Sequence, residues 1–468
     1  MSHINELQHT LKKRHITMIA LGGVIGAGLF VGSGAIISTA GPAAILSYLI
    51  AGIIVTLVMF MLGEMAARNP DAGSFSVYAS TYLGQWAGYT VGWLYWFKWM
   101  ITIAIEALLL GSIIHDFLPF IPIWVGAFAM TVIVISSNVY SVRSFAEFEY
   151  WLSFAKVATI IIFLALGISI LLGFQNNVHP TVLSDLTASG GFMPNGMSPV
   201  LAGVIVVIFS LGGSEIAAVA SGESEDPRKN VIKAIRSVVV RVLVFYVGSV
   251  LILILCVPWT DKAALKSPYV SLFSMAGFPL AAIAIKIVLF ISFMSVMNSG
   301  MYSASRMLFS LSRRGYAPAL FSKTTSRGVP LSALALSLIV CSAVLVVHFL
   351  SGGDLFLTLA KSSGSFIIVV WLFIAFAHLS MRRGLGDVRR GERQFQAWFY
   401  PYSNWLAIAA LVTVLLSQAT NPASRFQFGF TILVFVVVIA SYLVLRNRPL
   451  FGMSRVTAAG DPRRLNLD

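Results

Sequence analysis

Charged residues are scarce in this chain of 468 residues. They make up 11% of the sequence, whereas soluble globular proteins carry about 25%. Hydrophobic residues account for 58%. The composition excludes a soluble globular protein. It predicts an all-α membrane protein that is embedded in the lipid bilayer.

Cysteine is also rare. Cys256 and Cys341 lie in separate apolar stretches, so they form neither a disulfide framework nor a metal site. The sequence also lacks an HExxH motif, a nucleophile elbow and a P-loop. We therefore predict that the protein is not an enzyme, binds no metal or cofactor, and draws energy from a gradient rather than from ATP.

The formal net charge of +14 does not indicate a nucleic-acid partner, because the basic residues stand between apolar stretches. Windows of about 20 apolar residues predict twelve membrane-spanning helices. These spans cover roughly residues 16–37, 42–66, 84–113, 121–138, 150–173, 199–220, 237–258, 278–299, 329–350, 355–379, 399–418 and 427–446.

The connections between consecutive spans are numbered in chain order. Lysine and arginine gather at both termini and in the even-numbered connections, to which Arg241 and Arg306 are assigned. The odd-numbered connections contain three of the 32 basic residues, namely Lys262, Lys266 and Arg425. Cytoplasmic loops of membrane proteins are enriched in lysine and arginine. The asymmetry therefore places both termini in the cytoplasm.

The first span contains an unusual number of glycines, including the run GGVIGAG from Gly22 to Gly28. Each glycine inside a helix costs about 1 kcal/mol relative to alanine. A helix that unwinds at membrane depth bares amide and carbonyl groups that bind small charged solutes. The alternative is close helix packing, since Gly22 and Gly26 also form a small-xxx-small pattern.

The sixth span is interrupted in the same way, at Phe209-Ser210-Leu211-Gly212-Gly213-Ser214-Glu215. Two glycine-interrupted spans in corresponding halves of a chain indicate a transporter binding site. We therefore expect helices 1 and 6 to be unwound in the middle of the membrane. A zwitterion would meet amide groups with its carboxylate and carbonyl groups with its ammonium.

The span spacing predicts two five-helix repeats followed by two more helices. The predicted parts are a cytoplasmic N-terminus (1–15), a first repeat (16–173), an external loop (174–198), a second repeat (199–379), two additional helices (380–446) and a cytoplasmic tail (447–468).

Ionisable residues inside the spans are candidate functional residues, because a charge at the bilayer centre costs at least ~2.5 kcal/mol. Glu106 could pair with a substrate ammonium, titrate with coupling protons, or be a protonated acid between helices. Lys156 could snorkel to the interface or stand as a fixed ammonium beside the first break, where a coupling cation would bind. Glu215 could form an inner gate, bind polar groups freed by the break, or cap the restarting half-helix.

Several stretches resemble the bacterial amino acid transporter family of the amino acid–polyamine–organocation superfamily. They include LKKRHITMIALGGVIGAGLFVGSG, LGEMAARNPDAGSFSVYA, NVYSVRSFAEFEYW and FSLGGSEIAAVASGES. IEA at Glu106 and NVYSVRSFAEFEYW look closest to the 4-aminobutyrate (GABA) permease branch. The resemblance implies a LeuT-type fold, with two inverted five-helix repeats plus two helices, and proton-coupled amino acid uptake across the bacterial inner membrane.

The resemblance also implies roles for individual residues. The carboxylate and part of the amine would be held by Val24, Ile25, Gly26, Ala27 and Gly28. Amine-binding carbonyls and a gating ring would come from Phe209, Ser210, Leu211, Gly212 and Gly213. Lys156 matches the family lysine that replaces a sodium ion, and Glu106 and Glu215 match acidic positions.

The chain departs from the family pattern at Lys98, Lys361 and Phe366, which bear on the choice of substrate. The sequence therefore predicts a proton symporter for GABA or a related ω-amino acid. An importer of an aromatic, basic or small neutral α-amino acid is the alternative. A membrane sensor or channel is a third reading, although no continuous polar pore or extra soluble domain is apparent.

Overall fold

The structure is a computed structural model. It describes residues 13–71, 73–140, 142–174, 190–221, 223, 226–277, 279–351, 356–385, 395–422 and 424–446. Most of the predicted external loop and the whole predicted tail lie outside these ranges. Within them the protein is helical and contains no strand.

In the first half of the chain the described residues form nine helices, one of them a short 3-10 helix. They are α1 (Lys13–Gly22), α2 (Ala27–Phe30), α3 (Gly32–Ala40), η1 (Gly41–Ala43), α4 (Ala44–Arg68), α5 (Ser74–Leu83), α6 (Gln85–Phe117), α7 (Ile123–Tyr140) and α8 (Val142–Leu171).

The second half continues the bundle, and a π-helical turn, η2, joins α12 to α13. Its elements are α10 (Met197–Leu211), α11 (Ile216–Ser221), α12 (Pro227–Val240), η2 (Arg241–Gly248), α13 (Ser249–Cys256), η3 (Ala264–Lys266), α14 (Pro268–Met275), α15 (Pro279–Arg313), η4 (Ala319–Ser322), α16 (Leu331–Ser351), α17 (Phe356–Leu385), α18 (Tyr402–Thr420) and α19 (Arg425–Leu445).

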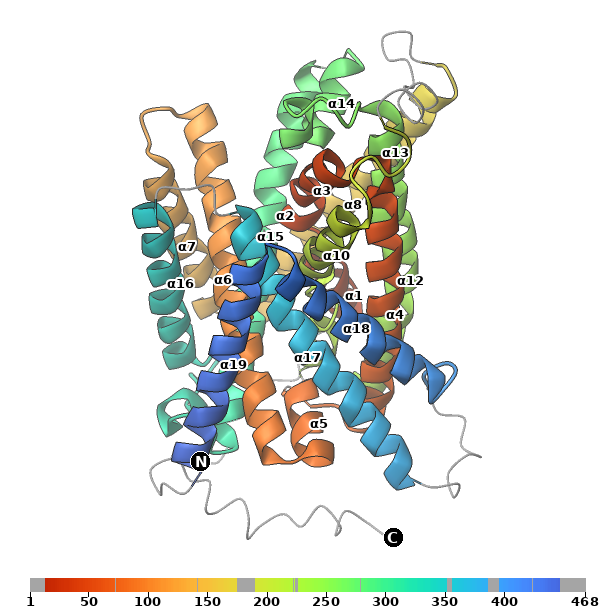
Figure 1. Cartoon of the computed structure of the whole chain (residues 1–468). Helices are drawn as coiled ribbons and strands as arrows, with labels where there is room; N and C mark the ends of the chain where they lie inside the picture. Colours follow the sequence, from red (N-terminus) through yellow and green to blue (C-terminus); the bar gives the residue numbers. More distant parts are fainter. Residues whose placement is uncertain are drawn as a thin grey trace.

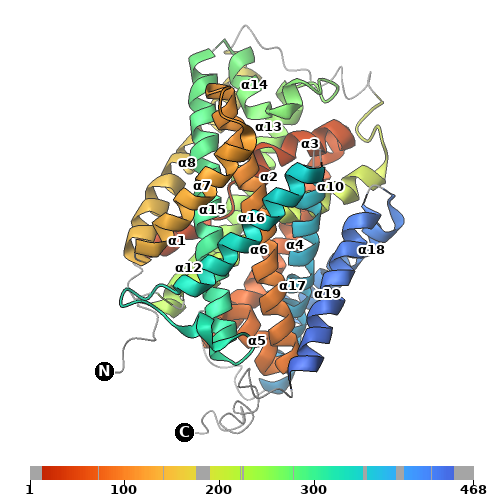
Figure 2. The same ribbon diagram turned by 90° about the vertical axis from the view of Figure 1, so that its left-hand side faces the viewer.

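The helices run side by side in one elongated bundle, with α14 at one end and α5 at the other (Figures 1 and 2). In Figure 1, α7 and α16 lie on the left, α4, α12 and α13 lie on the right, and α2 and α10 lie between them. The side chains of α2, and those of α10 from Val204 to its end, are buried. The broken helices therefore occupy the centre of the bundle.

The outer surface is apolar along the helices. Large side chains such as Ile133, Leu350, Leu433 and Val444 are exposed, as expected of a surface that faces lipid tails. Ten helical stretches among the described residues are long and apolar enough to cross a membrane, and Ile123–Val139 is a shorter apolar helix. The protein is therefore a multi-pass membrane protein, while the count of twelve spans and the inverted repeat stay predictions.

Two basic residues that were expected in connections, Arg241 and Arg306, are buried within helices, so that expectation is wrong for both. Arg241 is buried at the start of η2. Arg306 is buried in α15, and its Nε lies 2.9 Å from Oε1 of Glu223. Tyr302 donates a hydrogen bond to the same oxygen (2.9 Å). The carboxylate offsets the buried charge of Arg306, which lets the helix continue through that position.

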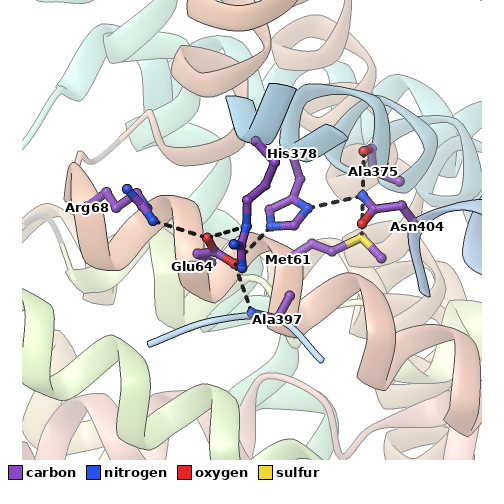
Figure 3. Close-up of polar contacts among 8 residues, drawn as sticks. Met61, Glu64, Arg68, Ala375, His378, Ala397 and Asn404 are labelled. Carbon is purple, nitrogen blue, oxygen red and sulfur yellow. Dashed lines mark hydrogen bonds and ion pairs between the residues drawn. The ribbon is translucent and has the colours of Figure 1, made fainter. Parts of the chain in front are cut away.

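A second buried carboxylate, that of Glu64, joins three helices near the α5 end of the bundle (Figure 3). Glu64 lies 3.0 Å from Nε2 of His378 and 2.8 Å from Nε of Arg382, both on α17. It also accepts the backbone N–H of Ala397 (2.8 Å). Asn404 of α18 places its Nδ2 3.0 Å from Nδ1 of His378, so Nδ1 accepts and Nε2 donates to Glu64. Charge-assisted hydrogen bonds of this kind hold α4 against α17, and Asn404 extends the network to α18 through His378.

Candidate substrate-binding site

The first glycine-rich span is broken, as predicted. α1 ends at Gly22, α2 begins at Ala27, and Gly26 has an extended backbone (φ −153°, ψ −150°). The break leaves backbone groups without partners in their own helix, and side chains take them up. Glu106 accepts a hydrogen bond from the Ala27 N–H, whose nitrogen lies 3.2 Å from Oε1 and 3.4 Å from Oε2. The predicted acidic residue thus lies at the start of the second half-helix.

The second predicted break is also present. α10 ends at Leu211 and α11 begins at Ile216. Gly213 has φ +130°, which L-residues rarely adopt. Glu215 accepts the Gly213 N–H through Oε2 at 3.0 Å, so the carboxylate binds a group that the break sets free. Binding polar groups that the break frees is one of the roles expected for Glu215, while a gating or capping role stays a prediction.

The two breaks touch each other. A Cβ atom placed on Gly213 would lie 2.3 Å from the carbonyl oxygen of Gly23, and one placed on Gly28 would lie 2.4 Å from Cα of Ser210. Real Cβ atoms do not approach that closely, so glycine is required at both positions. The residues predicted to hold the two ends of a zwitterion therefore come together at one place in the bundle.

Tyr246 links the breaks, and the sequence did not single it out. Its hydroxyl lies 2.9 Å from the Val24 carbonyl oxygen and 3.1 Å from that of Ser210. Tyr246 belongs to η2, whose sequence reads as an ordinary apolar span. No sequence pattern marks it, because its role arises from where η2 packs.

Lys156 lies at the first break and does not snorkel to the surface. Its Nζ donates to the carbonyl oxygens of Gly22 and, at 3.2 Å, of Ile25. It also donates to Oγ of Ser295 at 2.7 Å. An ammonium group has three N–H donors, and all three have acceptors here. The side chain is fully buried, so a fixed cation replaces helix hydrogen bonds that the break removes.

Lys98 lies beside the second break, whereas Lys361 and Phe366 do not face either one. The Lys98 Nζ would lie 3.4 Å from a Cβ placed on Gly212, and 3.6 Å from the Trp99 ring centroid. Lys361 instead donates to Ser424 (3.3 Å). Phe366 packs edge-on against Phe97 and Phe430.

Three buried polar atoms at the second break have no hydrogen-bond partner within the described part of the chain. They are Nζ of Lys98, Oγ of Ser210 and Oε1 of Glu215. Buried polar atoms normally have partners, so these atoms give the breaks an unused capacity to bind a polar solute. The site thus combines bared backbone dipoles with two basic side chains, Lys156 and Lys98, and two acidic ones, Glu106 and Glu215.

A bundle of apolar helices with two central helix breaks and buried charges is the arrangement of a solute transporter. The sequence matches the model of the amino acid permease family over residues 15–451, and the chain belongs to that family. It therefore transports an amino acid across a membrane, and its relatives are permeases, which are transporters and not enzymes.

The similar curated proteins are permeases of several specificities. The gamma-aminobutyric acid permease of Bacillus subtilis is 44% identical over 94% of both chains. The protein of the same name from Escherichia coli is 39% identical over 95% of both chains. The aromatic amino acid transport protein AroP of Corynebacterium glutamicum is 36% identical, over 94% of this chain and 96% of its own.

Proposed function

We propose that the protein is a proton symporter that imports GABA or a related ω-amino acid across the bacterial inner membrane, with both termini in the cytoplasm. The observation that carries the proposal is the contact between the two helix breaks, with the charged residues Lys156 and Glu106 bound to the first of them. The names of the two relatives at 44% and 39% identity favour GABA. The distribution of lysine and arginine supports the orientation.

In this proposal the substrate lies between the breaks. Its carboxylate takes the N–H groups at Ala27 and Gly28, at the positive end of the α2 half-helix. Glu106 holds the Ala27 N–H, so its negative charge opposes the incoming carboxylate. Protonation of Glu106 removes that repulsion and frees the amide. Proton binding therefore favours substrate binding, which is the requirement for symport.

The second break supplies the other contacts. The substrate ammonium meets its carbonyl groups and the unpartnered Oε1 of Glu215. Lys98 Nζ lies beside Gly212, and Gly28, at the proposed carboxylate position, lies beside Ser210. Ser210 and Gly212 are two residues apart, so Lys98 is near the proposed carboxylate position. A buried cation there favours a carboxylate and disfavours a substrate with a basic side chain.

An α-amino acid is the second candidate, because the relative from Corynebacterium glutamicum is named for aromatic amino acids. A competition assay in proteoliposomes separates the two. Labelled GABA uptake is measured against a panel of ω-, aromatic, small neutral and basic amino acids. We expect ω-amino acids to compete best and lysine and arginine to compete about tenfold less well, a difference of about 1.4 kcal/mol.

Stronger competition by an α-amino acid would show that this amino acid, and not GABA, is the substrate. The proposed transport mechanism would still hold. Ion conductance without saturable uptake would instead support a channel and contradict the proposal. Uptake that does not respond to an imposed proton gradient would contradict proton symport.

A further inference from the structure

A buried carboxylate that the proposed mechanism does not use lies next to Lys156. Glu149 lies on α8, two helical turns before Lys156, and it is fully buried. Ser295 of α15 lies between them: its Oγ accepts a hydrogen bond from Lys156 Nζ (2.7 Å) and donates one to Oε1 of Glu149. A continuous hydrogen-bonded chain therefore runs from the ammonium through a hydroxyl to a carboxylate.

The direction of each hydrogen bond is fixed by chemistry. An ammonium only donates, a carboxylate only accepts, and a serine hydroxyl can do both. Ser295 must therefore point its proton at Glu149 while its lone pair faces Lys156. This is the orientation in which one proton can enter the hydroxyl as another leaves it.

The surroundings of Glu149 keep it able to accept a proton. Ser153 donates to Oε1 (3.1 Å), and Nδ2 of Asn298 donates to Oε2 (3.2 Å). The amide of Asn298 is oriented in turn by Asn138 of α7, whose Nδ2 donates to its Oδ1 (2.7 Å). Donors that converge on a carboxylate stabilise its charged form, which is the proton-accepting form.

The chain also touches the first break. The carbonyl oxygen of Gly22, the last residue of α1, accepts a hydrogen bond from Lys156. A Cβ atom placed on Gly22 would lie 1.7 Å from Oγ of Ser153 and 2.7 Å from Oε1 of Glu149. A movement of the α1 end changes the partners of Lys156 and the surroundings of Glu149 together. The substrate site and the hydrogen-bonded chain are therefore mechanically linked.

We propose that Glu149 is the residue that takes the proton from Lys156, through Ser295, on its way to the cytoplasm. This inference rests on the proposed proton symport. Both transfers lie within hydrogen-bond reach. Chains of buried acidic residues serve as proton relays in other membrane transporters.

The transfer is balanced. The N–H bond of Lys156 that faces Ser295 breaks as a new O–H bond forms on Ser295 Oγ, and the original O–H bond of Ser295 breaks as one forms on Oε1 of Glu149. Lys156 becomes a neutral amine, Glu149 becomes a neutral acid, and Ser295 is unchanged. Glu149 is about 10 Å nearer than Lys156 to the start of α8, the end predicted to face the cytoplasm. Glu147, two residues earlier, is already 36% exposed, so water is close to that end of the chain.

The test uses the full chain in proteoliposomes and the Glu149→Gln variant. Glutamine keeps the size of the side chain but cannot accept the proton. We expect accumulation driven by an imposed proton gradient to fall about tenfold or more, while exchange of labelled for unlabelled substrate across the membrane stays close to wild type. The probe is the amino acid that the wild-type protein exchanges fastest in the panel above. Glu147→Gln, which changes a half-buried carboxylate on the same helix that pairs with Arg14 of α1, is the control and should accumulate substrate normally.

Wild-type accumulation by Glu149→Gln would overturn the relay. If that variant loses exchange as well, Ser295→Ala, which removes only the linking hydroxyl, repeats the test. Loss of accumulation with retained exchange in Ser295→Ala would support the relay, whereas accumulation by it, or loss of exchange in both variants, would overturn it. Failure of the wild-type protein to accumulate substrate on a proton gradient would instead contradict the proposed symport, so the two failures are distinguishable.

Discussion

Lys156→Ala is expected to abolish proton-driven accumulation and to leave substrate exchange partly intact. Lys156 is the cation that holds Gly22, Ile25 and Ser295 together at the first break. Alanine removes the charge and all three hydrogen bonds, so no group at this position can gain or lose a proton. We expect accumulation to fall by about a hundredfold, within the range typical of a lost proton-transfer group. Uptake into proteoliposomes, with and without a proton gradient, measures it.

Lys361→Ala is the matched control for this experiment. Lys361 is another lysine inside an apolar helix. Its side chain is partly buried, and it contacts Ser424 instead of either break. It should accumulate substrate as the wild-type protein does. Full accumulation by Lys156→Ala would show that the buried ammonium has a structural role only, and would remove Lys156 from the coupling mechanism.

Gly213→Ala is expected to eliminate substrate binding. The new Cβ would lie 2.3 Å from the Gly23 carbonyl oxygen, which is backbone and cannot move without displacing the first break. The positive φ of +130° adds strain of about 1–3 kcal/mol for a residue other than glycine. The two breaks must therefore separate. We expect the thermal shift that the substrate produces in the wild-type protein to disappear, together with exchange.

Gly429→Ala controls for the effect of replacing a glycine. Gly429 lies in α19, and a Cβ placed there has no heavy atom within 4 Å among the described residues. Alanine should stabilise this helix by about 0.5–1 kcal/mol and leave transport unchanged. If Gly213→Ala binds substrate as tightly as Gly429→Ala, close contact between the breaks is not needed for binding.

The sequence predicted the two helix breaks because their cause is local. Paired glycines weaken a helix wherever they occur, so the interruptions at Gly23–Gly26 and Gly212–Glu215 need no knowledge of the fold. The charges at Glu106 and Lys156 were identifiable for a similar reason, since an ionisable residue inside an apolar span requires a partner. The partners of these charges could not be named from the sequence, because they lie on other helices.

The features that the sequence missed depend on tertiary contacts. Glu149 stands at the edge of a predicted span, where a charge needs no explanation, and only the packing of α15 against α8 shows its link to Lys156. A window of about 20 apolar residues ends at residue 299, so Arg306 was expected in a connection, whereas α15 continues to Arg313. The partner that offsets its charge, Glu223, is far away in sequence. Phe366 was expected near the site, but it packs against Phe97 and Phe430.

The most direct test of the account is an experimental structure of the protein with its amino acid bound. The account predicts the substrate between the breaks, with its carboxylate at the N–H groups of Ala27 and Gly28 and its ammonium at the second break near Glu215. Glu106 should then have released the Ala27 N–H. A substrate bound elsewhere in the bundle, with Glu106 still accepting the Ala27 N–H, would contradict it.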